Sequence, residues 1–251
     1  MAPNMAVLRV FSLVPLLSAS LIWIYYLIQQ APITENQCTI NFLFPKKMDD
    51  ITKLNSCLKQ YYQNNYLYIL TLYSSIYIFK QTFCIPGSII LNVLAGSLFG
   101  TGYGFLLVCI LSSIGVSACY CMSKLCGLEE VITQFLPSQL TSAKISLENL
   151  VKKNQDQLWY LLTVLRVIPI TPNWLLNLVA PVIKIPLWTF MYTTFFGLMP
   201  YNYICCQSGQ TLSSINSLDE IFTFKTTLQL MSIAVAMVMI KVASKFCKIQ
   251  T

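Results

Sequence analysis

The sequence predicts an all-α polytopic membrane protein, a helical bundle that contains two inverted re-entrant helical hairpins. Three observations lead to this fold class. The chain of 251 residues is 56% hydrophobic and only 10% charged, whereas an average soluble domain is about 25% charged. The charged residues are confined to segments between long apolar stretches. Two of these stretches are interrupted by Pro, Gly and Asn at corresponding places, which is typical of inverted repeats with broken helices.

The apolar stretches are long enough for several membrane crossings. A helix needs about 20 mainly apolar residues to cross the hydrocarbon core. The stretches without Asp, Glu, Lys or Arg are 10–34, 60–79, 81–123, 167–183, 185–218 and 226–240. The longest of them has room for two passes. All nine acidic residues lie between these stretches, as expected when a charge in lipid is costly.

Composition argues against several functional classes. The chain has no histidine, so it lacks an imidazole base and any catalytic Ser-His-Asp or Cys-His pair. No glycine-rich phosphate loop or calcium loop is present. We therefore expect no enzyme and no cofactor. The net charge of +7 could suggest nucleic acid, but its placement in loops beside apolar stretches argues against that partner.

Eight of the ten cysteines fall into two groups. Six lie in apolar stretches, where a free cysteine behaves as a small hydrophobic residue. They are Cys84, Cys109, Cys119, Cys121, Cys205 and Cys206. Their spacing is not that of a zinc site, and we expect no bound metal. Cys38 and Cys57 lie instead in the polar segment 31–60. They would form a disulfide if this segment faces an oxidising lumen, and would otherwise remain free.

The N-terminal 60 residues are expected to form an anchor and a polar loop. Residues 1–30 read as an uncleaved hydrophobic anchor, with a signal peptide cleaved near 18–20 as the alternative. Within the loop 31–60, apolar residues at 51, 54, 58 and 61 predict an amphipathic helix that starts near Asp49 and Asp50. That helix packs either on its own protein or on the lipid surface.

Residues 61–225 are expected to form the membrane domain. A first span is predicted over 62–79, ending at Lys80, and a second over 104–123. A third is predicted over 187–208. The polar segment 124–157 between the second and third spans carries an amphipathic helix near 140–151. Residues 226–251 then form a last span, over 226–243, and a basic tail whose lysines favour a cytosolic C-terminus.

The two interrupted segments, near 83–100 and 158–182, are expected to be re-entrant. Pro86 removes a backbone donor next to Gly87 and Ser88, and Asn92 follows. Exposed backbone and amides are not tolerated facing lipid, so this segment should border a polar cavity. Gly96, Gly100 and Gly104 recur at four-residue spacing, a ridge that lets another helix approach closely.

An internal similarity links these two segments. Residues 91–96 read Leu-Asn-Val-Leu-Ala-Gly and residues 176–181 read Leu-Asn-Leu-Val-Ala-Pro. This similarity either arises by chance among apolar residues or marks two halves whose broken helices meet at one cavity. The residues expected to form the groove are Pro86, Gly87, Ser88, Asn92, Arg166, Pro169, Thr171, Pro172, Asn173 and Asn177.

Arg166 is the one guanidinium beside a predicted break, with no acid nearer in the sequence than Asp156. A guanidinium inside the membrane calls for an anion or backbone carbonyls, and its planar fork suits a phospholipid phosphate. The alternative is a structural role, in which Arg166 extends to the interface or caps a half-helix.

Three stretches of the chain, at 83–100, 165–181 and 197–209, closely resemble the transmembrane protein 41 family, and the wording at 91–96 and 200–205 resembles its A branch. The resemblance implies membership of the DedA superfamily, also described by its VTT or SNARE-associated Golgi protein domain. It implies paired re-entrant helices and energy-independent scrambling of phospholipids in the endoplasmic reticulum or early secretory pathway. Membrane phospholipids are thus the expected partners, and protein partners are unknown.

Two departures from the bacterial members of that superfamily matter. Ser88 stands where they often carry an acid, and Pro172 stands where they carry a second arginine. Both losses weaken the case for proton coupling and favour a passive polar groove. The competing hypotheses are an ion-coupled transporter of a small anion or lipid precursor, and a membrane scaffold without transport.

Overall fold

The computed structural model describes residues 11, 13–32, 48–125, 138–153, 155–167, 173–210, 228 and 231–232. All regular secondary structure in this part of the chain is helical. The α-helices are α2 (Leu13–Gln29), α3 (Met48–Asn64), α4 (Tyr66–Thr82), α5 (Ser88–Phe99), α6 (Thr101–Leu125), α8 (Ser138–Lys153), α9 (Leu158–Val167), α10 (Asn173–Val179), α11 (Leu187–Gly197) and α12 (Met199–Gln210); η1 (Gln155–Gln157) is a 3₁₀ turn.

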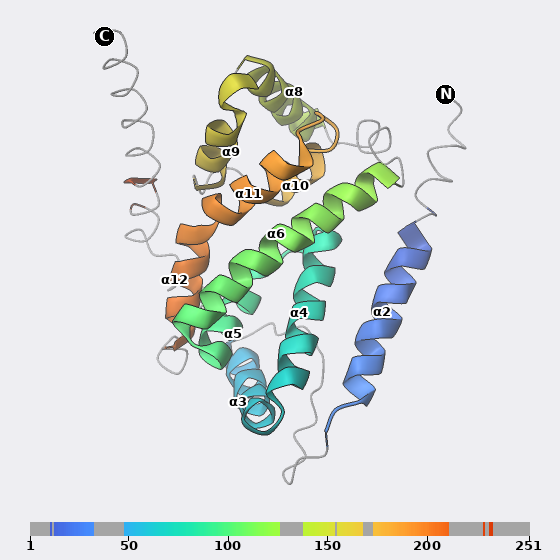
Figure 1. The fold of residues 1–251 in the computed structure, drawn as a ribbon, viewed down its shortest axis with the longest axis vertical. Coiled ribbons are helices and arrows are strands. Elements are labelled where there is room, and N and C mark those ends of the chain that lie inside the picture. The colour runs from blue at the N-terminus through green and yellow to red at the C-terminus, as the bar shows by residue number, and fades with distance from the viewer. Residues whose placement is uncertain are drawn as a thin grey trace.

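Helix α6 runs diagonally through the centre of the bundle (Figure 1) and packs against α4, α5, α11 and α12. It confirms that the segment 104–123, predicted to be a span, is helical. It has 25 residues and contains an 18-residue stretch with a mean hydropathy of 2.2, which makes it the one helix in the described ranges that is long and apolar enough to cross a membrane. Leu106, Ile110 and Ile114 lie four residues apart on α6 and are about half exposed. An exposed apolar stripe on such a helix is what lipid contact requires.

Helix α4 corresponds to the first predicted span, shifted a few residues toward the C-terminus, so that Lys80 lies inside the helix. The span predicted over 187–208 is divided, because α11 ends at Gly197 and α12 begins at Met199. Pro200 accounts for the division, since its ring crowds the carbonyl four residues earlier and it donates no hydrogen bond. The backbone bonds continue on both sides of the junction, from Leu198 N to Thr194 O at 3.1 Å and from Asn202 N to Leu198 O at 2.8 Å.

The first predicted interruption is present as a turn between α4 and α5. Ile85 N donates to Lys80 O at 2.9 Å, and Gly87 has a φ of 104°, a left-handed conformation that glycine adopts without strain. The second interruption separates α9 from α10. The course of either segment relative to a membrane, and hence their re-entrant character, remains a prediction.

Helices α5 and α12 approach each other through glycine. A Cβ atom placed on Gly96 would lie 1.8 Å from the carbonyl oxygen of Cys206, and one on Gly209 would lie 2.0 Å from that of Val93. In the same way, a Cβ atom placed on Gly104 would lie 2.6 Å from the carbonyl oxygen of Ala95. Gly100 does not have the packing role predicted for it: it ends α5 with a φ of 79°, and a Cβ there would meet only Gln210, at 4.0 Å. The glycine ridge therefore packs α5 through Gly96 and Gly104, while Gly100 turns the chain into α6.

Helices α2, α3 and α8 lie at the periphery of the bundle (Figure 1). Helix α3 confirms the amphipathic helix expected near Asp49, and its Tyr61 is buried against the cluster around α4 and α5. Helix α8 confirms the amphipathic helix expected near 140–151. Helix α2, in the segment predicted to be an anchor, lies along α4 (Figure 1), where Trp23 Nε1 donates to Ser75 Oγ at 3.1 Å.

Two further expectations concern residues that the structure does not describe. Cys57 is disulfide-bonded, but Cys38 lies outside the described residues, so the Cys38–Cys57 pairing stays a prediction. The last span, over 226–243, lies almost wholly outside them as well.

Candidate functional site

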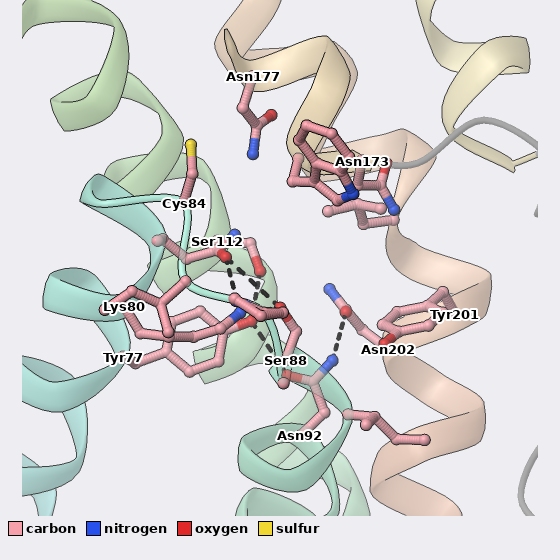
Figure 2. A pocket seen from close by; sticks show the side chains of 17 residues that line it. Tyr77, Lys80, Cys84, Ser88, Asn92, Ser112, Asn173, Asn177, Tyr201 and Asn202 are labelled. Atoms are coloured by element: carbon pink, nitrogen blue, oxygen red, sulfur yellow. Dashed lines mark hydrogen bonds between the residues drawn. The ribbon is translucent and has the colours of Figure 1, made fainter. Parts of the chain in front are cut away.

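A cavity of about 250 Å³, lined by both polar and apolar residues, lies where the interrupted segments meet. One wall is formed by the end of α4, the turn at 84–87 and the start of α5; the facing wall is formed by α10 and the junction of α11 with α12. Figure 2 shows Lys80, Ser88 and Asn92 on the first wall. Asn177, Asn173 and Asn202 approach from the other helices. A cavity lined by amides, hydroxyls and an ammonium group is unusual inside so apolar a bundle, where each buried polar group must be compensated.

The backbone around Gly87 opens the first wall. Pro86 cannot donate a hydrogen bond, and Gly87 caps α5 without any side-chain bond to the first turn. The first amides of a helix have no partner within the helix, and Ser88 and Ile89 both line the cavity. The turn thus presents the N-terminal end of α5, with its partial positive charge, to the cavity.

A buried hydrogen-bond network anchors the floor of the cavity. Asn92 is fully buried; its Nδ2 donates to Asn202 Oδ1 at 2.9 Å, and its Oδ1 accepts from the hydroxyl of Tyr77 at 3.0 Å. Tyr77 also lies 2.8 Å from Ser112 Oγ, which must be the donor there because the tyrosine proton is already used. The network joins α4, α5, α6 and α12, and a satisfied network of this kind holds its members in one arrangement.

Lys80 is the cation of this cavity. Its side chain is only 4% exposed, and its Nζ donates to Gln81 Oε1 at 3.1 Å and to Ser88 Oγ. Both partners are neutral, and no carboxylate in the described ranges pairs with it. The cavity therefore holds a positive charge that these residues do not neutralise.

Arg166, the cation expected in the groove, is not one of the lining residues. It is 3% exposed, and its guanidinium lies 4.7 Å from the ring centroid of Phe190. Its Nη2 donates to Asn177 Oδ1 at 3.3 Å, and its Nη1 has no hydrogen-bond partner among the described residues. Arg166 thus reaches the cavity only through Asn177.

The other predicted groove residues fall into two sets. The structure brings together Pro86, Gly87, Ser88, Asn92, Asn173 and Asn177, all of which line the cavity. The two asparagines of the internal similarity, Asn92 and Asn177, are therefore on the same cavity. Pro169, Thr171 and Pro172 lie outside the described residues.

Sequence reasoning missed Tyr77, Lys80, Gln81, Ser112, Tyr201 and Asn202. A signal was present for the first three, because residues three and four apart share a face of a helix and Tyr77, Lys80 and Gln81 have that spacing on α4. Asn202 follows Pro200, the same combination of proline and asparagine that marks the two predicted interruptions.

Comparison with known proteins identifies the family. Residues 85–211 match the VTT domain, from the turn before α5 to the end of α12. The chain is 30% identical to mouse transmembrane protein 41B over 236 residues, which are 94% of this chain and 79% of that protein. The chain belongs to the transmembrane protein 41 family.

Other relatives in the transmembrane protein 41 family agree. Human transmembrane protein 41B is 33% identical over 83% of this chain and 70% of its own length. A transmembrane protein 41 homolog of Dictyostelium discoideum is 33% identical over 82% of this chain, which spans 60% of that protein's length. No solved structure matches. The names of these relatives and the VTT domain support a membrane protein. The membership of this chain in the A branch of the family stays a prediction.

The match to the VTT domain encloses most of the cavity. It contains the turn at Gly87, α10 and α12, whereas Tyr77, Lys80 and Gln81 precede it. The cation of the cavity thus comes from a helix outside the matched domain.

Proposed function

We propose that this protein is an energy-independent phospholipid scramblase, which moves phospholipids between membrane leaflets through the polar cavity. The observation that carries the proposal is the cavity itself, with its amide, hydroxyl and ammonium lining inside an apolar bundle. A location in the endoplasmic reticulum or early secretory pathway belongs to the same proposal, because it is what the family resemblance implies.

The physical argument concerns the head group. Moving a polar group from water into an apolar medium without hydrogen bonds costs roughly 2–7 kcal/mol, and charged groups cost more. Asn173 and Asn177 on one wall and Ser88 and Lys80 on the other offer replacements for the lost water bonds. The acyl chains would stay in lipid along the exposed apolar faces of the bundle, such as that of α6.

The lining bears on the competing ion-coupled transporter. Proton or cation coupling inside a membrane usually uses a carboxylate, and the described lining of the cavity contains no Asp or Glu. A passive path needs no such group, so the described lining favours scrambling.

Reconstitution of the purified protein tests this function. Vesicles carry a nitrobenzoxadiazole-labelled phospholipid in both leaflets, and dithionite quenches only the label that reaches the outside. Scrambling predicts that quenching proceeds beyond the outer-leaflet half without nucleotide or ion gradient. Quenching that stops at that half, as in protein-free vesicles, would refute the proposal. Uptake of a small anion only under an imposed gradient would favour the transporter.

A further inference from the structure

We infer that the cavity contains an anion-binding site centred on Lys80, and that this site favours lipid head groups of net negative charge over zwitterionic ones. The identification of a lipid as the source of the anion rests on the proposed function. The anion site itself rests on Lys80 and on the N-terminal end of α5.

The first observation is the unneutralised charge of Lys80. The ammonium group has three N–H donors; two bond to Ser88 Oγ and Gln81 Oε1, and the third has no acceptor among the described residues. The side chain is 96% buried and lines the cavity. A buried charge that is not paired is costly, and an anion in the cavity would remove that cost.

The second observation is the end of α5. Ser88 and Ile89, its first two residues, line the cavity beside Lys80. Gly87 provides no side-chain cap. The amide of Ile90 donates to Gly87 O at 3.2 Å, so the amides of Ser88 and Ile89 are the ones that the helix itself does not pair. These amides and the helix dipole together attract negative charge. Two positive features from different elements, α4 and α5, therefore lie on one wall.

Charge balance then distinguishes the head groups. A zwitterionic head group brings as much positive as negative charge, so the cavity would remain positive. A head group of net charge −1, such as that of phosphatidylserine or phosphatidylglycerol, would neutralise Lys80. Electrostatic interactions are stronger in a poorly solvated site than in water, so this difference should influence which lipid enters.

The cavity also has features that suit a lipid better than a free anion. Ile85, Ile89, Leu198 and Trp174 line it together with the polar groups. Trp174 is 42% exposed, which provides a partly open apolar wall for the glycerol and the first acyl carbons. Inorganic phosphate has no apolar part to occupy that wall.

The test compares two lipids in the same reconstituted vesicles. We expect labelled phosphatidylserine to cross about tenfold faster than labelled phosphatidylcholine, the change that one charge-assisted hydrogen bond gives. In Lys80→Met the ratio of the two rates should fall to near one, and in Lys80→Arg a preference should remain. Lys153→Met, which removes an exposed lysine of α8, should keep the wild-type ratio. Equal rates for both lipids in an active wild-type protein would overturn the inference and leave the scramblase function intact.

A binding measurement keeps the two proposals separable if no lipid crosses. Intrinsic tryptophan fluorescence, to which Trp174 at the cavity contributes, is titrated in detergent with dioctanoyl phosphatidylserine, dioctanoyl phosphatidylcholine and inorganic phosphate. The protein used elutes as a single peak in size exclusion, and a Trp174→Phe variant identifies the part of the signal that comes from the cavity. Tighter binding of the serine lipid than of the choline lipid, lost in Lys80→Met, supports the inference even without scrambling. Equal binding of the two lipids overturns the inferred preference for anionic head groups. This holds even if inorganic phosphate binds and its binding is lost in Lys80→Met.

Discussion

The close approach of α5 to α12 makes Gly96→Ala the most quantitative perturbation that the fold offers. The new Cβ would lie 1.8 Å from the carbonyl oxygen of Cys206, while ordinary contacts begin at 3.4 Å. The two helices would have to separate by about 1.6 Å, and backbone on both sides leaves no flexible side chain to yield. Overpacking of this kind costs roughly 1–3 kcal/mol. For a chain of this size, that corresponds to a fall of about 2–12 °C in the midpoint of thermal unfolding.

The assay is thermal unfolding of the purified protein in detergent, followed by size-exclusion chromatography. Gly102→Ala is the matched control, because a Cβ at Gly102 has nothing within 4 Å and alanine favours helix over glycine by up to about 1 kcal/mol. Its midpoint should stay the same or rise. A midpoint for Gly96→Ala equal to that of Gly102→Ala would refute the packing of α5 on α12 through glycine.

The remaining predictions concern the surroundings of the cavity. Asn92→Ala removes a fully buried amide and leaves its tyrosine and asparagine partners short of a bond, so it should cost about 1–3 kcal/mol in thermal unfolding, whereas Asn64→Ala at the exposed end of α3 should change nothing. Arg166→Met keeps the packed side-chain stem but removes the hydrogen bond to the Asn177 amide. Scrambling should become about two- to tenfold slower, the effect of one hydrogen bond. An unchanged rate would show that Arg166 has a purely structural role. The Sγ atoms of Cys84 and Cys119 lie 3.4 Å apart, so copper phenanthroline should join them in a disulfide-linked peptide seen by mass spectrometry, and recovery of both as separate thiols would contradict their placement.

The spacing of apolar residues and the positions of Pro and Gly predicted the helices and turns that depend on local sequence. Helix α6 follows from an apolar stretch that is long enough to span, and α3 from apolar residues spaced three and four apart. The turn at Gly87 follows from the missing donor of Pro86 and the conformational freedom of glycine. Asn92 and Asn177 were predicted as groove residues because an amide is rarely tolerated facing lipid, and both line the cavity.

The features that sequence reasoning missed depend on tertiary contacts. Lys80 follows a 20-residue stretch without charge, a position that normally marks the end of a span, and its burial arises because the turn and α5 fold back over it. The break at Leu198 was missed because the stretch 185–218 contains no charged residue and reads as one continuous span, although Pro200 interrupts the helix there. For Arg166 the sequence left open a phosphate ligand and a structural role, and its packing partner Phe190, far along the chain, could not be predicted from the sequence.

The central claim is that phospholipids pass through the cavity, and blocking the cavity tests it most directly. Ser88→Phe places a large apolar side chain at the wall formed by the start of α5, whereas Ser146→Phe places the same side chain at an exposed position of α8. Both variants are reconstituted, and the rate of dithionite quenching beyond the outer-leaflet half is compared with that of the wild-type protein. We expect Ser88→Phe to lose this phase while Ser146→Phe retains it. Equal, wild-type rates in a correctly folded Ser88→Phe protein would contradict the account.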